Sequence, residues 1–302
     1  LTLGMSFLAG VGHGAVDLCA SVLMSRLYPE RSASALSLTS LFFGIGAFAG
    51  PALAGLFLAR SGSGLAALWI TTALLLVQAL VIYLLRGAAP KQAPHSQTAE
   101  SGPLYGSLLL WMLGLMILLY VGAETIVGSW ITAYISDTTS LSYDTATLAA
   151  SAYWLALTLG RLTNSVLTLR LPARLTLGLT LAGSLLSGVL LALSQGSSAL
   201  SIGAVVGAGF FFGAIYPSVI SITSTIFAHS PGRAVSLVAA LGSIGGMFLP
   251  WLHGWLLNQV SPAAYTIGLC VVIGAMLAAY LYVELATGRK TVPLAPAAGS
   301  RR

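Results

Sequence analysis

Three ionisable side chains, Asp17, Glu124 and Arg161, stand alone inside long apolar stretches of the sequence. An ionisable group at bilayer depth costs about 2.5–3.5 kcal/mol on insertion scales, so its presence there needs a reason. A carboxyl group in a low-dielectric environment can hold a proton near neutral pH or, when ionised, help to coordinate sodium. In either state it can hydrogen-bond a solute hydroxyl. We therefore take Asp17 and Glu124 as candidate binding residues for a polar solute or its coupling ion.

The same three side chains have structural alternatives. A lone carboxyl group can serve only as a hydrogen bond to a neighbouring helix. The long stem of Arg161 can carry its charge to the membrane interface or cap a helix there. For Arg161 this structural role is favoured, and a binding role is the alternative.

Aromatic and amide side chains form a second group of candidates. Tyr120 lies one turn before the acidic residue of its own segment, on the same face, and Tyr216 directly precedes Pro217, where a helix must kink. Tyr153 and Asn164 share one face of a helix. Aromatic rings stack on the apolar faces of sugars, and an amide binds hydroxyls as donor and acceptor. Interfacial anchoring is the alternative for the aromatic residues.

The remaining reactive side chains form no catalytic or metal-binding pattern. Cys19 and Cys270 stand alone, without a CxxC or metal-ligand spacing. His13 and His253 lie singly on glycine-rich runs, where we expect hydrogen bonds between helices. No G-x4-G-K-[ST], H-E-x-x-H or G-x-S-x-G motif occurs, so the sequence predicts neither an enzyme nor ATP-driven chemistry. It predicts no metal site and no cofactor.

Composition indicates the environment of these candidates. Apolar residues make up 57% of the chain and charged residues only 7%, whereas soluble domains carry roughly a quarter charged residues. Such a chain has too few charged side chains to form a water-exposed surface, but its composition suits the hydrocarbon core of a bilayer. The net charge of +6 comes from basic residues scattered singly between apolar runs, which argues against a nucleic-acid partner.

Uncharged runs of about 20 residues or more mark the predicted transmembrane helices. Strands are excluded, because runs of this length inside lipid must satisfy their backbone groups internally. Turn-forming residues and charges separate nine such runs. They lie near 1–25, 33–59, 63–86, 104–134, 146–169, 175–194, 199–227, 234–257 and 263–286. The sequence therefore predicts an all-α, polytopic membrane protein.

The basic residues gather on one side of the predicted spans. With alternating spans, that side carries Arg26, Arg31, Arg86, Lys91, Arg170, Arg174, Arg233, Arg289, Lys290, Arg301 and Arg302. The opposite loops carry Asp137 and Asp144, and Arg60 is the exception. The positive-inside rule therefore places the polar central linker and the C-terminus in the cytoplasm. With an odd number of spans, this orientation places the N-terminus on the outer side. An internal repeat explains the odd number.

A glycine and proline pattern recurs at a constant offset of 199 residues. The motif G-x4-P-x3-G that begins at Gly46 recurs at Gly245, and the G-x3-G motif at Gly10 recurs at Gly209. The first three spans thus correspond to the last three in parallel orientation, six helices apart. Parallel six-helix repeats, each of three plus three helices, resemble the architecture of the major facilitator superfamily. In that arrangement the first three helices of a twelve-helix fold are missing, and the chain is an N-terminally truncated fragment.

Several motifs also resemble the fucose-permease and sodium-dependent glucose transporter group of that superfamily. The string Tyr120–Trp130 resembles the seventh helix of that group, and Gly10–Asp17 its fourth. Gly213–Pro217 and Gly245–Pro250 resemble its tenth and eleventh helices, and Gly160-Arg161 is similar to a motif of the eighth. In this superfamily the fourth, seventh and tenth helices line the cavity. The resemblance therefore implies that the two intramembrane carboxyl groups face the substrate path from opposite halves.

The chain departs from this group at Ser21, where an Asn is expected four residues after the acidic residue of the fourth helix. The resemblance thus implies a transporter without fixing its substrate. It implies ion-coupled symport of a monosaccharide or similar small polar solute by alternating access, with H⁺ or Na⁺ as coupling ion. The alternatives are an efflux antiporter for amphipathic compounds and a truncated, non-transporting fragment.

The predicted organisation follows the same arrangement. Residues 1–86 form the second half of an N-terminal six-helix bundle, 87–103 a cytoplasmic linker, 104–287 a C-terminal six-helix bundle and 288–302 a cytoplasmic tail. The expected location is the cell membrane, inner or plasma. The expected partners are the lipid bilayer and a small-molecule solute, with no nucleic acid. The oligomeric state stays open.

Overall fold

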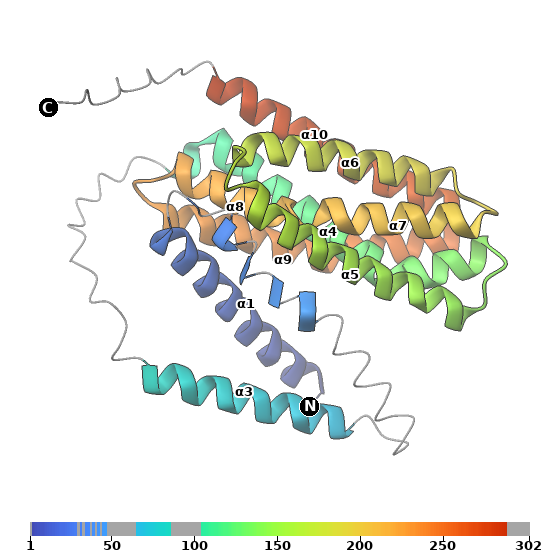
Figure 1. Ribbon diagram of the computed structural model, residues 1–302, viewed down its shortest axis with the longest axis horizontal. Coiled ribbons are helices and arrows are strands. Elements are labelled where there is room, and N and C mark those ends of the chain that lie inside the picture. Colours follow the sequence, from blue (N-terminus) through green and yellow to red (C-terminus); the bar gives the residue numbers. More distant parts are fainter. Residues whose placement is uncertain are drawn as a thin grey trace, which may run out of the picture.

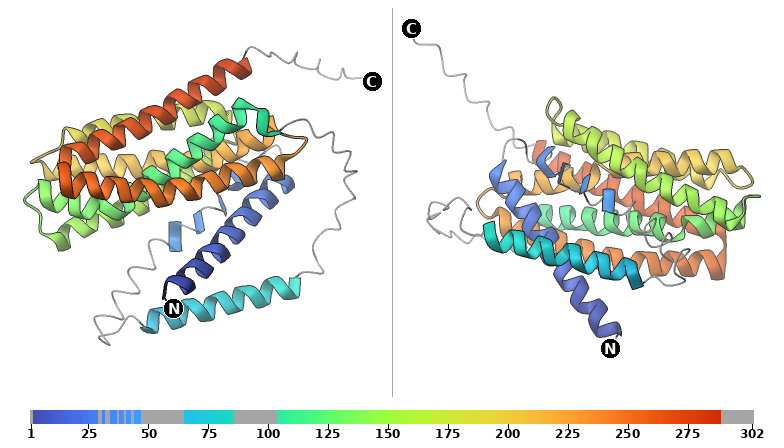
Figure 2. Two further views of the ribbon diagram at one scale, coloured as in Figure 1. Left: turned by 180° about the vertical axis from the view of Figure 1, so that it is seen from behind. Right: turned by 60° about the horizontal axis from the view of Figure 1, so that its bottom comes forward.

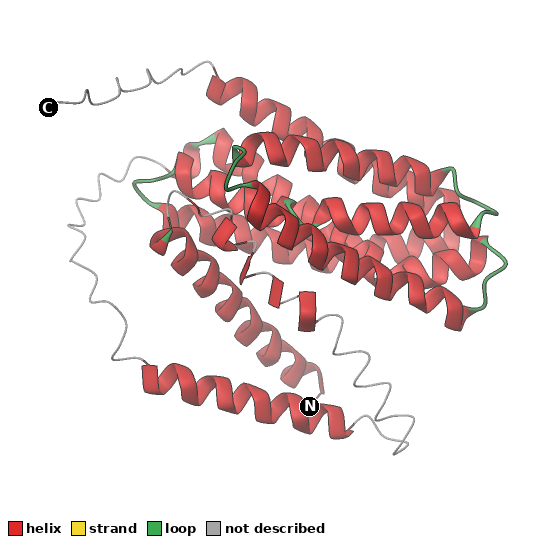
Figure 3. Ribbon diagram, in the orientation of Figure 1, coloured by secondary structure: helices red, strands yellow, loops and turns green. Residues whose placement is uncertain are grey.

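The computed structural model describes residues 2–28, 31, 34–36, 38–39, 41–42, 44–46, 65–85 and 104–288. All regular structure in these ranges is helical, as Figure 3 shows, in agreement with the predicted all-α class. Most of the predicted run 33–59, the linker 87–103 and the tail beyond Gly288 lie outside the described residues.

The helices coincide with the predicted apolar runs to within a few residues. The N-terminal ones are α1 (Thr2–Leu27) and α3 (Leu65–Leu85), followed by a short turn η2 (Leu104–Gly106). The C-terminal ones are α4 (Leu108–Thr138), α5 (Tyr143–Leu167), α6 (Ala173–Ala192), α7 (Ser198–Phe212), α8 (Ile215–Ile226), α9 (Pro231–Trp255), η3 (Leu256–Val260) and α10 (Pro262–Gly288).

Within the described ranges, five helices are long and apolar enough to cross a membrane. They are Leu108–Thr138, Ala173–Ala192, Ser198–Ile226, Pro231–Val260 and Pro262–Gly288. Shorter apolar helices lie at Leu8–Met24 and Leu68–Leu84. Helix α5 is not among the five, because hydroxyl, amide and guanidinium groups interrupt its apolar run. The count of nine spans, and the absence of a first three, therefore stay predictions.

The segment from α4 to α10 forms one antiparallel bundle (Figures 1 and 2). Helix α4 lies at its centre, packing along α9 and α10, while α5 packs along α7. We call the end where α5 ends at Leu167 and α6 begins at Ala173 the near end. The end where α4 ends at Thr138 and α5 begins at Tyr143 is the far end.

The helix is interrupted between α7 and α8, as predicted for the segment before Pro217. Helix α7 ends at Phe212 and α8 begins at Ile215. Proline has no backbone N–H, so the carbonyl of Gly213 loses its helical partner and the chain can bend there. The break leaves Tyr216 in the first turn of α8.

The N-terminal helices are much less buried than the bundle. Helix α1 leans on α8 and α9 with the part that ends at Leu27, and its N-terminal part diverges from the bundle (Figure 1). Val22 and Met24 are the α1 side chains that pack against the hydrophobic core. Every described side chain of α3 is exposed. The core therefore lies mainly in the C-terminal bundle, with Leu36 as an N-terminal contributor, and α1 rests on one end of it.

Candidate functional site

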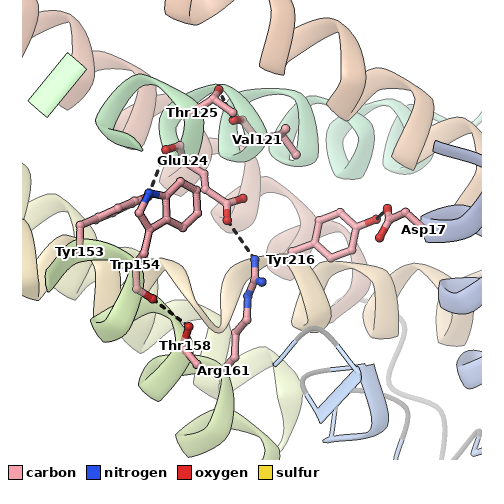
Figure 4. Close-up of polar contacts among 9 residues, drawn as sticks. All are labelled: Asp17, Val121, Glu124, Thr125, Tyr153, Trp154, Thr158, Arg161 and Tyr216. Atoms are coloured by element: carbon pink, nitrogen blue, oxygen red, sulfur yellow. Dashed lines mark hydrogen bonds and ion pairs between the residues drawn. The ribbon is translucent and has the colours of Figure 1, made fainter. Parts of the chain in front are cut away.

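Glu124 and Arg161 form an ion pair inside the C-terminal bundle. Glu124 lies midway along α4, and its Oε1 is 2.9 Å from Nη2 of Arg161 on α5 (Figure 4). The two side chains are only 9% and 5% exposed, respectively. The expectation that Arg161 extends to the interface is therefore wrong: its guanidinium turns inward and neutralises the carboxylate. Removing either partner would leave an uncompensated buried charge, which is strongly destabilising.

Helix α5 reaches this position because glycines replace side chains where it crosses α7. A Cβ atom at Gly160 would collide with the main chain of Phe210, and one at Gly209 with the main chain of Tyr153. Gly213 faces α5 in the same way. Small residues let two helix backbones approach closely, as in other membrane helix pairs. The contact fixes the rotation of α5, and with it the direction of the arginine one residue further on.

Aromatic side chains surround the ion pair. The hydroxyl of Tyr153 donates to the main-chain carbonyl of Glu124 at 3.1 Å. The buried ring of Tyr120 lies 6.1 Å from that of Phe212, edge to face, and 6.2 Å from that of Tyr216. The rings of Tyr153 and Phe212 also meet edge to face, at 6.5 Å. Sequence reasoning missed Phe212, since nothing distinguishes it within the apolar run of α7.

The second carboxyl group has a different environment. The hydroxyl of Tyr216 on α8 donates to Oδ2 of Asp17 on α1 at 3.0 Å, across 199 residues of sequence (Figure 4). Asp17 itself is exposed. The separation equals the repeat offset, so these two residues occupy equivalent positions in the two repeats.

The other polar predictions lie elsewhere on the helices. Asn164 is buried on α5, one turn beyond Arg161 towards the near end. His253 is buried, its Nδ1 lies 3.0 Å from the carbonyl of Leu249 on its own helix, and its ring meets that of Tyr265 on α10 edge to face. At this histidine the ring contact links α9 with α10. His13 is exposed.

The site combines the chemistry needed to hold a neutral polar molecule. The guanidinium can donate, the carboxylate can accept, and the surrounding rings offer apolar faces. Because the two charges cancel, the pair presents no net charge to a solute. Within the described ranges, no three His, Cys, Asp or Glu side chains lie close enough to hold a metal ion.

Solved structures with the same arrangement of helices are transporters. A crystal structure of the E. coli fucose:proton symporter FucP superimposes with a TM-score of 0.74, covering 90% of this chain and 74% of that one at 16% identity. A bacterial homologue of the iron transporter ferroportin, in an outward-facing state, superimposes with a TM-score of 0.64, covering 93% and 70% at 17% identity. At these identities the likeness shows the fold alone.

Sequence comparison finds relatives of low identity. A putative glucose/galactose transporter of Helicobacter pylori (strain ATCC 700392 / 26695) is 25% identical over 209 residues, which are 69% of this chain and 50% of that protein. Protein TsgA of Escherichia coli O6:K15:H31 is 25% identical over 263 residues, 85% of this chain and 65% of that protein. The chain thus spans half to about two thirds of the length of these relatives. The sequence model of the Major Facilitator Superfamily matches residues 1–118 and 112–301, nearly the whole chain, and the chain therefore belongs to this superfamily.

Proposed function

We propose that this protein is a secondary active transporter that carries a monosaccharide, or a similar small polar solute, together with H⁺ or Na⁺ by alternating access. Membership of the superfamily supports transport as the general activity. The putative glucose/galactose transporter and the fucose:proton symporter among the similar proteins support a sugar as solute.

The observation that carries the proposal is the buried ion pair Glu124–Arg161 with its aromatic surroundings. A sugar has hydroxyls that donate and accept, and apolar faces that stack on rings. The pair supplies both hydrogen-bonding roles without a net charge that would select an ionic solute. Tyr120 and Tyr216, whose rings meet, connect this pair with the carboxylate of Asp17.

The coupling ion has two candidate sites of different character. Glu124 already has a cationic partner, whereas the carboxylate of Asp17 accepts from a neutral hydroxyl. A proton or sodium ion would therefore meet, at Asp17, a carboxylate whose described hydrogen-bond partner carries no charge. In this proposal the protein lies in the cell membrane with the near end of the bundle in the cytoplasm. Arg170, Arg174 and Arg233 at that end support this orientation.

The test is uptake by proteoliposomes that hold the full protein, with a panel of labelled hexoses. Imposed proton and sodium gradients are compared for wild type and Glu124→Gln. Glu284→Gln is the matched control, because this acid pairs with Arg174 at the near end, 3.5 Å away and partly exposed. We expect gradient-driven uptake of one sugar, retained in the control and lost in Glu124→Gln.

Uptake is normalised to the folded protein in each preparation, so that loss of protein is not mistaken for loss of transport. Uptake of no sugar under either gradient would remove the sugar from the proposal. Efflux of amphipathic compounds, which the cluster of aromatic rings also suits, would then become the leading function. Uptake by Glu124→Gln at the wild-type rate would show that the ion pair is not needed for binding the solute.

A further inference from the structure

Four tyrosine side chains are completely buried in the C-terminal bundle. They are Tyr120 and Tyr134 on α4, Tyr153 on α5 and Tyr265 on α10. A tyrosine hydroxyl can donate and accept, and when buried it usually finds a hydrogen-bond partner. The hydroxyls of Tyr134, Tyr153 and Tyr265 each donate to a main-chain carbonyl of another helix, at 3.0, 3.1 and 3.4 Å respectively. These three hydroxyls thus serve the packing of the bundle.

Tyr120 is the exception among the four. Its hydroxyl oxygen is buried and makes no hydrogen bond of normal length and angle to any residue that the structure describes. An unpaired buried polar group is unfavourable, so an exception of this kind in a native fold calls for an explanation. The ring itself is packed against those of Phe212 and Tyr216. The hydroxyl is therefore the part of this side chain that the described fold does not use.

The hydroxyl of Tyr120 lies beside the ion pair of the candidate site. Glu124 and Arg161 are both close enough to act on it electrostatically. Each of these two charges already has the other as partner, at 2.9 Å. A solute hydroxyl placed at this point would meet a guanidinium that donates, a carboxylate that accepts and a phenol that can do either.

Tyr134 offers a comparison within the same helix. It lies about four turns beyond Tyr120 on α4, so the two side chains point from nearly the same face. Residue type, helix and burial are the same in both. The difference is that Tyr134 donates to the carbonyl of Leu191, whereas the hydroxyl of Tyr120 is left next to the site.

We propose that the hydroxyl of Tyr120 determines specificity for the solute, by forming a hydrogen bond with one hydroxyl of the bound molecule. The proposal rests on the proposed function and deepens it by assigning a specificity-determining group. A site that hydrogen-bonds a solute hydroxyl rejects an analogue without it, because the polar group of the protein then stays unpaired. The solute must therefore carry a hydroxyl at the position that reaches Tyr120, which an amphipathic compound with an apolar surface at that point would not provide.

Deoxy sugars test this selection directly. Proteoliposomes that hold the full protein take up labelled D-glucose or D-galactose, and unlabelled monodeoxy derivatives, each lacking one hydroxyl, compete for uptake. Inhibition constants are compared for wild type, Tyr120→Phe and Tyr134→Phe. The last variant is the control, because it removes a buried hydroxyl of the same helix whose partner is a main-chain carbonyl.

We expect one derivative to bind wild type about tenfold to a hundredfold more weakly than the parent sugar, the effect of leaving one buried polar group unpaired. Tyr120→Phe weakens binding of the parent sugar by the same factor and leaves binding of that derivative unchanged. Discrimination at this one position therefore disappears, while discrimination at the other positions remains. Tyr134→Phe keeps the whole wild-type pattern. A merely structural role of Tyr120 would instead weaken the parent and all derivatives alike.

Thermal unfolding in detergent without any solute gives an independent measurement. We expect the midpoint of Tyr120→Phe to stay at or above that of wild type, because no described hydrogen bond is lost. Tyr134→Phe lowers the midpoint, since its hydrogen bond to the carbonyl of Leu191 is lost.

Discrimination that persists unchanged in Tyr120→Phe would overturn the proposal while leaving sugar transport intact. A midpoint of Tyr120→Phe as low as that of Tyr134→Phe would overturn it too, because the hydroxyl would then already serve the fold. If wild type takes up neither sugar and no derivative binds, the sugar proposal fails. An undiminished midpoint of Tyr120→Phe would in that case still support the hydroxyl as the unpaired group that awaits a different hydroxylated solute.

Discussion

The two carboxyl groups of the candidate site occupy opposite kinds of environment. Glu124 is buried in the centre of α4, paired with a guanidinium at 2.9 Å, and its carbonyl accepts from Tyr153. Asp17 is exposed on α1, and its carboxylate accepts from the neutral hydroxyl of Tyr216. Glu124 is thus part of the packing of the C-terminal bundle, whereas Asp17 is part of a contact between α1 and that bundle. One carboxylate is enclosed by protein, and the other lies at the surface of the described structure.

The repeat extends this difference to the helices that carry the two groups. Gly209 and Gly213 lie against the backbone of α5, where any side chain would collide. Their repeat-equivalents Gly10 and Gly14 meet no atom of the described residues within 4 Å. The same spacing of glycines therefore serves close helix packing in one repeat, whereas no such packing is present around the described part of the other. The C-terminal bundle is closely packed, and α1 rests on one end of it.

Loss of the buried cation is the change with the largest expected effect. Arg161→Ala leaves the carboxyl group of Glu124 in the core without its partner, and breaking a buried pair in this way costs about 3–5 kcal/mol of stability. The double variant Arg161→Gln with Glu124→Gln removes both charges and regains most of that loss. Thermal unfolding of the purified variants in detergent measures both effects. If the double variant is as unstable as Arg161→Ala, charge pairing is not what stabilises this part of α4 and α5.

The repeat-equivalent glycines give a matched pair of smaller effect. Gly209→Ala forces a methyl group against the main chain of Tyr153, and overpacking of this kind costs about 1–3 kcal/mol. Gly10→Ala adds the same methyl group in open space, and we expect a change within about 0.5 kcal/mol. The unfolding midpoints of the two variants are compared under identical conditions. An equal decrease of the unfolding midpoint in both variants would show that α1 is packed as closely as α7. The two repeats would then not differ in packing.

The helices of the C-terminal bundle could be predicted from sequence with good accuracy. The predicted run 175–194 is α6 at Ala173–Ala192, and the predicted kink before Pro217 is the break between α7 and α8. Apolar run length and proline chemistry act within one segment, so one segment suffices to predict them. The helical turn η3 at Leu256–Val260, which the structure forms as a π-helix, was not predicted.

Contacts between helices were much harder to predict. Glu124 and Arg161 were both selected as isolated ionisable residues, but their pairing depends on the rotation of α5 against α4. That rotation is set by Gly160 and its neighbours, whose packing partners a single sequence does not reveal. Tyr216 and Asp17 were also selected separately. The repeat offset of 199 residues relates them directly, and applying it to polar residues as well as glycines would have suggested the pair.

Asp17→Asn is the change with the smallest expected effect on stability, and it isolates the difference between the two acids. The side chain is exposed and the amide can still accept from Tyr216, so we expect an unfolding free energy within about 0.5 kcal/mol of wild type. Glu124→Gln, the same chemical change in the other acid, leaves the charge of Arg161 buried without its counter-ion and lowers the unfolding midpoint clearly. Thermal unfolding of the two variants side by side measures the difference. A loss at Asp17 as large as that at Glu124 would mean that both carboxylates stabilise the fold to the same extent, and that the two acids do not differ in structural role.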